Sequence, residues 1–579
     1  MRPQPLLFLV LVGGLGLALG LSVMLRQAPS AVAPEPQAGP SAPLGVGAVE
    51  YRGGIPQGHV YSGLADEPDA VNPFLAHGTT TRRYVLGFTH EGLLDIDPVT
   101  GELRPALASA YEPAADSMSC VFTLRDGVKF SDGSPVTMAD VLFGWELAKA
   151  GHLQFGLVGD AFGRVASAEA LSDRRLRLVW KEAHFAVLQA VGESWLVAKR
   201  QFFLDRVADL ARRLGQPVPA VDTAAFAELL GKVKRVTGPG TGPYQLPSEG
   251  DEPTTWRRRQ DLLLPRNPLH WRSALTPGTW NLAGIRLLFR MKDSAPMEAF
   301  AGTVDWYYDP GYKDLLARRP DLADRYRTMV YDYAGQPVLS MIWNCKHKPL
   351  DDVRVRRALA HLVDRAAIVR LFEDTARPAV ALTRPSAPDF PNGLQPPAFD
   401  GAAARRELRE AGFDPAAGKP LRLTVLSGSG NQVLNRALAL FQHQATEAGI
   451  ELTCHELDNT SFVAKKNEGL WDGLLTLRSL RTWGDPYDFV HTNGTDNEGH
   501  WSNPEADRLA TAARREPDAN RRNELLRELH KVVNDEQPIA LLAYPLVAIL
   551  FNKHIQNAES GPRGLWPERF WVPPEFQRR

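Results

Sequence analysis

Residues 421–457 decide the fold class, because three segments of different periodicity follow one another there. The first, LRLTVLSG (421–428), alternates as a strand does, and the second, NQVLNRALALFQHQATEAG (431–449), is helical and stops at a glycine. The third, IELTCHEL (450–457), alternates again. A strand, a helix and a strand in so short a span form a βαβ unit with parallel strands. The sequence therefore predicts an α/β fold.

An earlier segment, VFTLRDGVKFSDGSPVT (121–137), has the composition of a β-hairpin. It contains two Asp-Gly steps, which are turn signals, between strand-like runs. Thr137, with Asp140 three residues later, is typical of a capping box that starts a helix over residues 138–150. We therefore expect hairpin-rich structure in the first part of the chain.

The segment PLDDVRVRRALAHLVDRAAIVRLF (349–372) places its apolar residues at helical spacing. Asp351 or Asp352 stands where a helix cap is needed. The pattern predicts a helix that starts at one of these two residues. Together with the βαβ unit, it indicates that the later part of the chain alternates strands and helices.

The N-terminus carries an apolar run from Leu6 to Leu25. Its length is close to the roughly 20 residues that cross a bilayer and exceeds the usual apolar core of a cleaved signal peptide. We expect residues 1–28 to form either an uncleaved signal-anchor or a cleaved signal peptide, and both would export the rest of the chain. Residues 29–52 are rich in Pro and Ala and are expected to form a linker.

Composition and motifs narrow the class of protein. The 579 residues carry a formal net charge of -1, so no global field favours nucleic acid or acidic lipid. The three cysteines form no CxxC pair. The sequence also lacks HExxH, EF-hand, phosphate-loop and GxSxG motifs. We therefore expect no catalytic residues, no resident metal and no cofactor.

The stretch RTWGDPYDF (481–489) combines two aromatic residues with a carboxylate around a Gly and a Pro. Trp483, Asp485 and Tyr487 alternate along it, in a composition that does not favour a helix interior. The carboxylate could act in catalysis or in ligand binding. The segment could equally be a turn whose aromatic side chains pack into a core.

A second aromatic stretch, GTVDWYY (302–308), places Trp306 and Tyr307 near the end of a predicted strand. Aromatic residues in such a place either pack into the core or form the wall of a ligand site. The sequence leaves both roles open for these two residues.

A series of segments, in a fixed order along nearly the whole exported part, resembles the extracellular solute-binding protein family 5. This family contains the peptide and nickel receptors of bacterial ABC importers. The segments are VNPF (71–74), EGLLDIDPVTGELRPALASAYEP (91–113), FTLRDGVKFSDGSPVTMADVLFGWE (122–146), GTGPYQL (240–246), RNPLHW (266–271), FRMKDSAPMEAFAGTVD (289–305), WNCKHKPLDDVRVRRALAHLVDRAAIV (343–369), AGF (411–413) and RTWGDPYDF itself.

The resemblance implies a type II periplasmic-binding-protein fold, an α/β architecture of two lobes with a ligand cleft at the hinge. Residues 53–338 and 539–579 would form lobe I, and residues 339–538 would form lobe II. Members of this family have no catalytic machinery, which agrees with the missing motifs.

The resemblance also implies a function. The chain would be the substrate-binding component of an ABC importer, which captures oligopeptides or peptide-like solutes outside the cytoplasmic membrane and delivers them to permease subunits. A ligand that contacts both lobes would favour the closed state. The alternatives are a receptor for nickel or a metal chelate and a membrane-tethered solute sensor. We expect a periplasmic monomer, tethered by the N-terminal segment, with no nucleic-acid partner.

For the site, the stretch around Trp483 is similar to the RTWG-x-PYD of the nickel-binding branch. That similarity would place Trp483 and Tyr487 against the ligand. One possibility is that Asp485 takes over the contact that an acidic residue of the peptide-binding members makes with the peptide amine. The other is that the amine is not the anchor of the ligand. The nickel branch also holds carboxylates with arginines of the first lobe, a role that Arg82 or Arg83 could take here.

Overall fold

The structure is a computed structural model that describes most of the chain after the N-terminal segment. The described residues are 58–78, 80–156, 159–250, 252–291, 294–308, 311–333, 337–373, 375–479, 484–561 and 564–578. The apolar run and the linker of residues 1–52 lie outside them, and so does Trp483. Within the described ranges, no helix is both long enough and apolar enough to cross a membrane.

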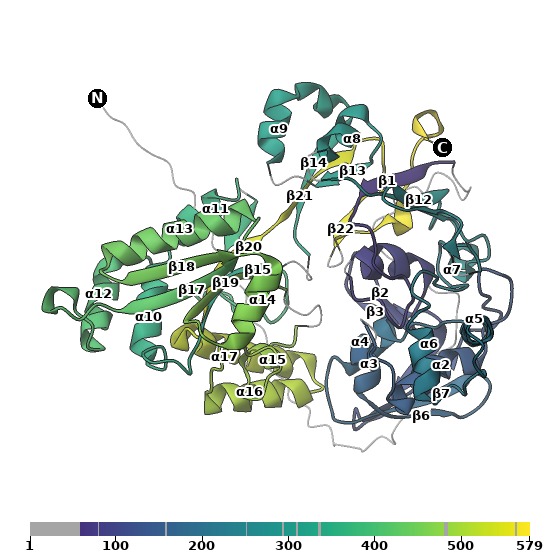
Figure 1. Cartoon of the computed structure of the whole chain (residues 1–579), viewed down its shortest axis with the longest axis horizontal. Helices are drawn as coiled ribbons and strands as arrows, with labels where there is room; N and C mark the ends of the chain where they lie inside the picture. Colours follow the sequence, from purple (N-terminus) through teal and green to yellow (C-terminus); the bar gives the residue numbers. More distant parts are fainter. Residues whose placement is uncertain are drawn as a thin grey trace, which may run out of the picture. The chain divides into compact units, whose positions relative to one another are not determined.

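The first lobe is built on a seven-stranded mixed sheet (Figure 1). Its strand order is β10 (Trp256–Arg257), β11 (Asp261–Pro265), β12 (Gly284–Leu288), β1 (Val60–Leu64), β13 (Trp306–Tyr308), β21 (Val547–Asn552) and β14 (Tyr326–Tyr331). β1 is parallel to β12 and β13, whereas β21 is antiparallel to both of its neighbours. Because β21 lies near the end of the chain, the first lobe contains the C-terminal part of the chain as well as the N-terminal part.

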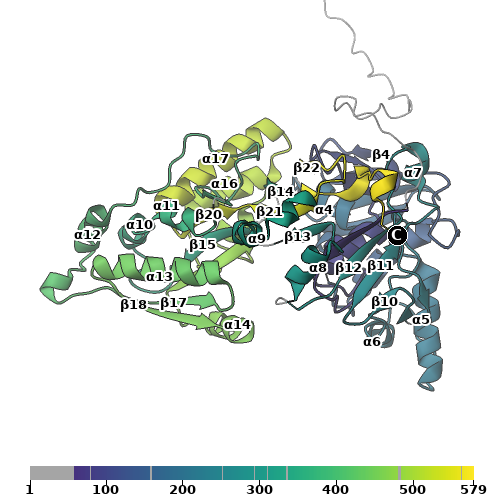
Figure 2. The same cartoon turned by 90° about the horizontal axis from the view of Figure 1, so that it is seen from above.

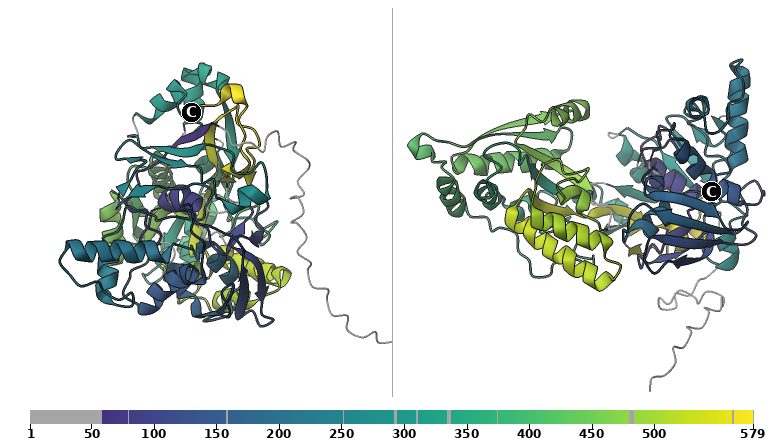
Figure 3. Two further views of the ribbon diagram at one scale, coloured as in Figure 1. Left: turned by 90° about the vertical axis from the view of Figure 1, so that its right-hand side faces the viewer. Right: turned by 90° about the horizontal axis from the view of Figure 1, so that it is seen from below.

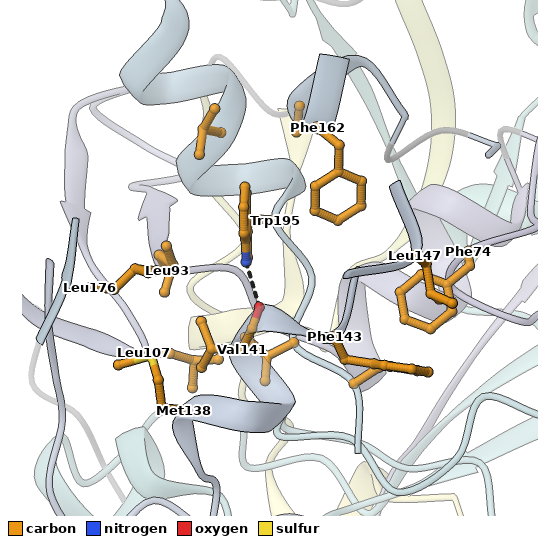
Figure 4. Packing of buried hydrophobic residues seen from close by; sticks show 14 of the residues in the cluster. Phe74, Leu93, Leu107, Met138, Val141, Phe143, Leu147, Phe162, Leu176 and Trp195 are labelled. Atoms are coloured by element: carbon orange, nitrogen blue, oxygen red, sulfur yellow. Dashed lines mark hydrogen bonds between the residues drawn. The ribbon is translucent and has the colours of Figure 1, made fainter. Parts of the chain in front are cut away.

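A smaller antiparallel sheet with its own core belongs to the same lobe. Its strand order is β4 (Ala108–Pro113), β5 (Ser119–Leu124), β7 (Arg175–Trp180) and β6 (Val165–Ala170). Trp195 lies fully buried in this core, and its indole N–H donates to the carbonyl of Val141 at 2.8 Å (Figure 4). This hydrogen bond satisfies the polar atom of a large apolar side chain, as buried tryptophans require.

The predicted capping box is confirmed at the start of α2 (Met138–Ala150). The Asp140 carboxylate accepts the backbone N–H of Thr137 at 2.9 Å and its hydroxyl at 2.6 Å. The hairpin before it is less regular than predicted. Gly133 has a φ of 87°, which allows the chain to turn there. The two sides of this turn are paired only by an isolated bridge between Lys129 and Pro135, and not by two full strands.

The second lobe contains a six-stranded sheet. Its order is β16 (Ala376–Pro378), β20 (Ile539–Pro545), β15 (Pro337–Trp343), β19 (Gly473–Ser479), β17 (Arg422–Gly428) and β18 (Glu451–Leu457). β17 and β18 are parallel and are joined by α13 (Gln432–Glu447). The βαβ unit predicted from the sequence is therefore confirmed, and with it the α/β fold class.

Helices cover both faces of this sheet (Figures 2 and 3). One core contains side chains of α10 (Val353–His361), α12 (Gly401–Glu410) and α13, and the other contains those of α15 (Tyr487–Val490), α16 (Pro504–Arg515) and α17 (Ala519–Glu536). Residues of β15 alternate between the two cores, since Met341 belongs to the first and Ile342 to the second. The strand is buried on both sides, which explains why its sequence, PVLSMIW, is apolar apart from Ser340.

The helix predicted for residues 349–372 is divided into two. Asp352 caps α10 by accepting the N–H of Arg354, as one of the two predicted alternatives required. A second cap, Asp364, then accepts the N–H of Ala367 and starts α11 (Arg365–Arg370). A side chain that competes for backbone N–H groups can therefore interrupt an apolar stripe of helical period.

The chain passes between the two sheets twice, between β14 and β15 and between β20 and β21. The second passage is at Leu546, later than the return near Pro538 that the sequence suggested. β20 belongs to the second sheet, where it lies between β15 and β16 with all seven residues buried. The apolar sequence runs on from β20 into β21, so no polar residue marks the point of passage.

A buried arginine connects the two passages. Arg384 forms an ion pair with Asp332, which follows β14, and donates to the carbonyl of Pro545 at 2.8 Å. Its guanidinium also lies 5.2 Å from the ring centroid of Tyr544. Arg384 thus contacts both passages of the chain between the two sheets.

Candidate functional site

A cavity of about 370 Å³ lies next to the two passages, and we call it the crossover pocket. Its volume is at the lower end of the roughly 300–1,000 Å³ range of small-molecule sites. Aromatic side chains dominate its walls: Tyr61, Tyr84, Phe88, Trp306, Tyr308, Tyr331, Tyr333, Phe372 and Trp566. The other described lining residues are Arg83, Ile285, Leu287, Pro337, Thr375, Asn431, Val433, Leu434, Leu477, Pro545, Leu546, Val547, Ala548, Ile549, Leu565 and Pro567.

Trp306 reaches the pocket because its neighbour in the sheet is a glycine. Gly63 pairs with Trp306 between β1 and β13, and a Cβ at Gly63 would lie only 2.0 Å from the indole. The indole therefore covers the glycine and stacks on Tyr84, with ring centroids 5.8 Å apart and planes 20° from parallel. Tyr307 is only 5% exposed and packs in the core on the other side of the sheet, as strand alternation requires.

Arg83 lies on the same wall, in the short π-helical segment Thr81–Leu86. Its guanidinium carbon is 5.0 Å from the ring centroid of Tyr333 and 5.6 Å from that of Tyr84. A terminal nitrogen also approaches Gly564, where an added Cβ would lie 3.0 Å away. Arg83 is the one lining residue among those described that carries a full charge at neutral pH.

The tyrosine hydroxyls near Arg83 stay protonated. Burial raises the pKa of Tyr331 to about 12, although the charge of Arg83 acts in the opposite direction. Burial likewise raises the pKa of Tyr61 and of Tyr84 above the usual value for a phenol. At neutral pH these side chains are therefore neutral and able to donate hydrogen bonds.

The second lobe contributes the opposite wall. Phe372 and Thr375 come from the segment between α11 and β16, and Asn431, Val433 and Leu434 come from the start of α13. The side chain of Asn431 accepts the N–H groups of Val433 and Leu434 and so caps its own helix. A solute in the crossover pocket would therefore contact both lobes.

The two lobes also meet at a second place, which we call the interlobe cluster: His184 and Phe185 of the first lobe with Asp485, Arg514 and Arg522 of the second. His184 Nε2 lies 2.9 Å from Asp485 Oδ2, and Arg514 Nη2 lies 2.7 Å from the same oxygen. The N–H of Phe185 donates to the carbonyl of Arg514 at 2.9 Å. The guanidinium of Arg522 lies 4.5 Å from the ring centroid of Phe185.

The negative charge of Asp485 is paired within the interlobe cluster. Its side chain is only 4% exposed, and its second oxygen accepts the N–H of Tyr487 at 3.1 Å. Burial alone would raise the pKa of Asp485, but the contact with His184 and the charge of Arg514 outweigh it and hold the pKa at about 2. Asp485 is thus ionised at neutral pH and paired with Arg514.

Tyr487 belongs to the same neighbourhood. Its ring stacks on His491, with centroids 4.1 Å apart and planes 14° from parallel. The guanidinium of Arg514 lies 3.6 Å from its ring centroid. Tyr487 therefore packs beside Asp485 and is not among the described residues that line the crossover pocket.

The structure thus separates the residues that the sequence brought forward. Arg83 and Trp306 line the crossover pocket, Asp485 and Tyr487 lie at the interlobe cluster, and Tyr307 lies in a core. Trp483 lies outside the described residues. The sequence reasoning did not find Tyr61, Tyr331 and Trp566, because these residues lie far apart in the chain and meet only in the folded structure.

A metal centre is not formed by the residues that the structure describes. In those ranges, no three His, Cys, Asp or Glu side chains come together in a way that could hold a metal ion.

Comparison with known proteins places this geometry in a family. Residues 102–501 match the model of the bacterial extracellular solute-binding proteins, family 5. The oligopeptide-binding protein OppA of Bacillus subtilis is 24% identical over 504 residues, which cover 82% of this chain and 86% of that protein. The di/tripeptide-binding protein 2 of Pseudomonas aeruginosa is 24% identical over 523 residues, covering 84% of this chain and 91% of that protein.

Solved structures show the same fold. The oligopeptide-binding protein AppA from Bacillus subtilis, in complex with a nonapeptide, gives a TM-score of 0.70 at 20% identity and covers 90% of this chain and 100% of its own. NikA from Brucella suis, in complex with Fe(III)-EDTA, gives 0.71 at 19% identity and covers 89% and 99%. The predicted two-lobe fold of type II periplasmic binding proteins is therefore confirmed.

Proposed function

This chain belongs to the bacterial extracellular solute-binding proteins of family 5, and we propose that it is the substrate-binding component of an ABC importer. It captures oligopeptides or peptide-like solutes outside the cytoplasmic membrane and delivers them to a permease. The matches to an oligopeptide-binding protein and to a di/tripeptide-binding protein over more than four-fifths of the chain support this proposal.

The observation that carries the proposal is the crossover pocket, whose walls come from both lobes. A solute bound there gains contacts that depend on the distance between the lobes, so its differential affinity favours the closed arrangement. Aromatic walls add apolar contact area, and their hydroxyls and indole N–H groups supply hydrogen bonds. The pocket binds and orients a solute without reacting with it, so the proposed function is not enzymatic.

Each residue that the sequence brought forward has a place in this proposal. Arg83 and Trp306 contact the solute, whereas Asp485 and Tyr487 hold the two lobes together at the interlobe cluster and Tyr307 supports the sheet. Trp483 stays a proposed ligand-wall residue on the sequence similarity alone.

Native mass spectrometry of the purified protein tests the proposal. Incubation with a mixture of peptides of two to nine residues should yield complexes with intact peptide. The mass spectrum of the unbound fraction should contain no new fragments. Fragments of the added peptides would contradict the receptor function and indicate an enzyme. Recovery of no peptide at all, while another class of solute binds, would contradict the peptide assignment.

A receptor for a metal chelate is the second candidate. The fold likeness to NikA in complex with Fe(III)-EDTA and the position of Arg83 in the pocket favour it, since a guanidinium suits the carboxylates of a chelator. Titration calorimetry with Ni(II)–L-histidine and with L-histidine alone distinguishes the metal-chelate receptor from the peptide receptor. Binding that requires the nickel ion would favour this candidate over the peptide receptor.

We further propose that residues 1–28 export the chain and tether it to the outer face of the cytoplasmic membrane, where it acts as a monomer with ABC permease subunits. Membrane fractionation and the mass of the N-terminus distinguish the tethered chain from a cleaved one. The alternative is that the tethered chain acts as a solute sensor and takes no part in transport. Deletion of the gene should abolish uptake of the bound peptide, and unchanged uptake would favour the sensor.

A further inference from the structure

The interlobe cluster is formed entirely by groups of this chain. Asp485 lies 2.9 Å from His184, and the carbonyl of Arg514 accepts the N–H of Phe185 at 2.9 Å. The guanidinium of Arg522 lies over the ring of Phe185. None of these five residues is among the described residues that line the crossover pocket. The contacts that the cluster makes between the lobes therefore need no solute.

The cluster and the pocket use different faces of the second-lobe sheet. Leu434 of α13 lines the pocket and belongs to the core on one face of this sheet. Tyr487 of α15 packs against the core on the other face, beside residues of α16 and α17. Asp485 precedes α15, and Arg514 and Arg522 lie in α16 and α17. A solute can therefore occupy the pocket while the cluster keeps its contacts.

The second-lobe half of the cluster, which we call the socket, consists of Asp485, Arg514 and Arg522. Asp485 pairs with Arg514 at 2.7 Å and accepts the N–H of Tyr487. Arg522 donates to two main-chain carbonyls of its own lobe. These contacts remain when the lobes part, so parting leaves no buried charge without its partner. The socket is thus ready to close again.

The first-lobe half is equally well defined. His184 and Phe185 lie between β7 and α4 (Val187–Ser194). Nδ1 of His184 accepts the N–H of Ala186 at 3.0 Å, so the ring hydrogen is on Nε2, the atom that faces Asp485. The rings of His184 and Phe185 also stack, with centroids 5.4 Å apart. The donor is therefore held in one orientation toward the socket.

We propose that the interlobe cluster is a latch, which holds the two lobes together before a solute arrives and thereby limits how fast a solute enters and leaves the crossover pocket. Entry and exit both require the lobes to part, which breaks the contact between His184 and Asp485. Because the cluster makes the same contacts with and without a solute, the latch slows both rates and leaves the dissociation constant nearly unchanged. The latch is independent of the solute's identity, whereas its effect on solute exchange rests on the proposed function.

Amide hydrogen exchange of the full chain, followed by mass spectrometry at residue resolution, tests the latch without any solute. The N–H of Phe185 donates across the lobes, so its exchange reports their separation. His184→Ala should speed this exchange about tenfold, because a contact between a donor and a charged group shifts an equilibrium by about that factor. His184→Gln keeps an N–H for Asp485 and should restore part of the protection.

Two further variants exclude a local effect of the substitution on its neighbour. Arg522→Gln acts from the other lobe and should also speed the exchange of the Phe185 amide. His152→Ala, at an exposed histidine of the first lobe, is the matched control and should leave it unchanged. Exchange of the Phe185 amide that is fast in the unaltered protein, or that Arg522→Gln does not change, would overturn the latch.

Stopped-flow tryptophan fluorescence with the tripeptide Ala-Phe-Ala measures the rates. His184→Ala should raise the association and dissociation rate constants about tenfold each, with a change of less than about threefold in Kd. Trp306→Ala is the contrasting variant, because loss of a pocket wall should raise the dissociation rate and Kd together. A rise in the dissociation rate alone in His184→Ala would identify His184 as a solute contact and overturn the proposal, as would unchanged rates.

The two experiments separate the latch from the proposed function. Faster exchange of the Phe185 amide in His184→Ala and Arg522→Gln, in a protein that binds no peptide, would support the latch and refute the peptide receptor. Peptide binding with rates and amide exchange that ignore both substitutions would support the receptor and refute the latch.

Discussion

The crossover pocket and the interlobe cluster both join the first lobe to the second, but they do so with different chemistry. The pocket leaves a cavity of about 370 Å³ between aromatic walls that carry a single charged side chain among the described residues. In the cluster, Asp485 is buried and paired with Arg514, and His184 lies against the same oxygen. Asp485 is thus ion-paired inside the cluster, whereas the guanidinium of Arg83 lies in the wall of a cavity.

The largest expected effect comes from removing the charge at the centre of the interlobe cluster. Asp485→Ala leaves Arg514 buried without its main partner, and we expect the free energy of unfolding to fall by about 3 kcal/mol. Asp488, whose carboxylate lies 3.5 Å from Arg514, can replace only part of this contact. Urea unfolding measures the change, with Asp488→Ala as the control that should lose less. A loss below about 1 kcal/mol for Asp485→Ala would show that the cluster does not couple the lobes.

The pocket should respond in affinity instead. Trp306→Ala removes an aromatic wall and the stacking with Tyr84, and we expect the affinity for bound peptide to fall about 30- to 100-fold. Stability should change little, because Trp306 is only half-buried. Phe399→Ala, at an exposed aromatic residue outside the pocket, is the control in the same titration. Unchanged affinity in Trp306→Ala would place the ligand elsewhere.

A fall in pH should weaken the ion pairing in the interlobe cluster before it affects ligand binding in the crossover pocket. The pKa of Asp485 is about 2 in the folded protein and near 4 when the chain is unfolded, so its contribution is present above about pH 4 and is lost as the pH falls toward 2. A shift of this size corresponds to roughly 2 kcal/mol. The pH dependence of the unfolding free energy measures it. Asp485→Asn should flatten the curve between pH 4 and pH 2, and an unchanged slope would contradict this account.

A smaller effect should follow from one methyl group beside Trp306. Gly63→Ala places a Cβ against the indole, which must move, and overpacking of this kind costs about 1–3 kcal/mol. The same displacement should lower peptide affinity. Gly428→Ala is the matched control, because this glycine also lies in a strand but has no atom within 4 Å of an added Cβ. Equal behaviour of the two variants would show that the indole is not held over Gly63.

Local signals in the sequence were sufficient for much of the fold. The alternation in β17 and β18 and the helical period of α13 predicted a parallel βαβ unit, and Thr137 with Asp140 predicted the start of α2. Each of these features depends on residues close together in the chain. The passage at Leu546 could not be located in this way, because two buried strands on either side of it share one apolar run.

The site was less predictable because its residues meet only in three dimensions. Asp485 is contacted by Arg514, 29 positions away, and by His184 of the other lobe. No spacing in the sequence predicts these contacts. The acidic residue between two aromatic residues was therefore interpreted as a candidate ligand contact. Trp306 and Tyr307 could not be told apart until the pairing of β13 with β1 fixed which one faces the pocket.

A crystal structure of the protein with its co-purifying or added peptide tests the central claim most directly. The account predicts ligand density in the crossover pocket, in contact with Arg83 and Trp306 and with residues of the second lobe, and no ligand atom against Asp485. Density beside Tyr487 and Asp485, with the crossover pocket empty of ligand, would contradict it.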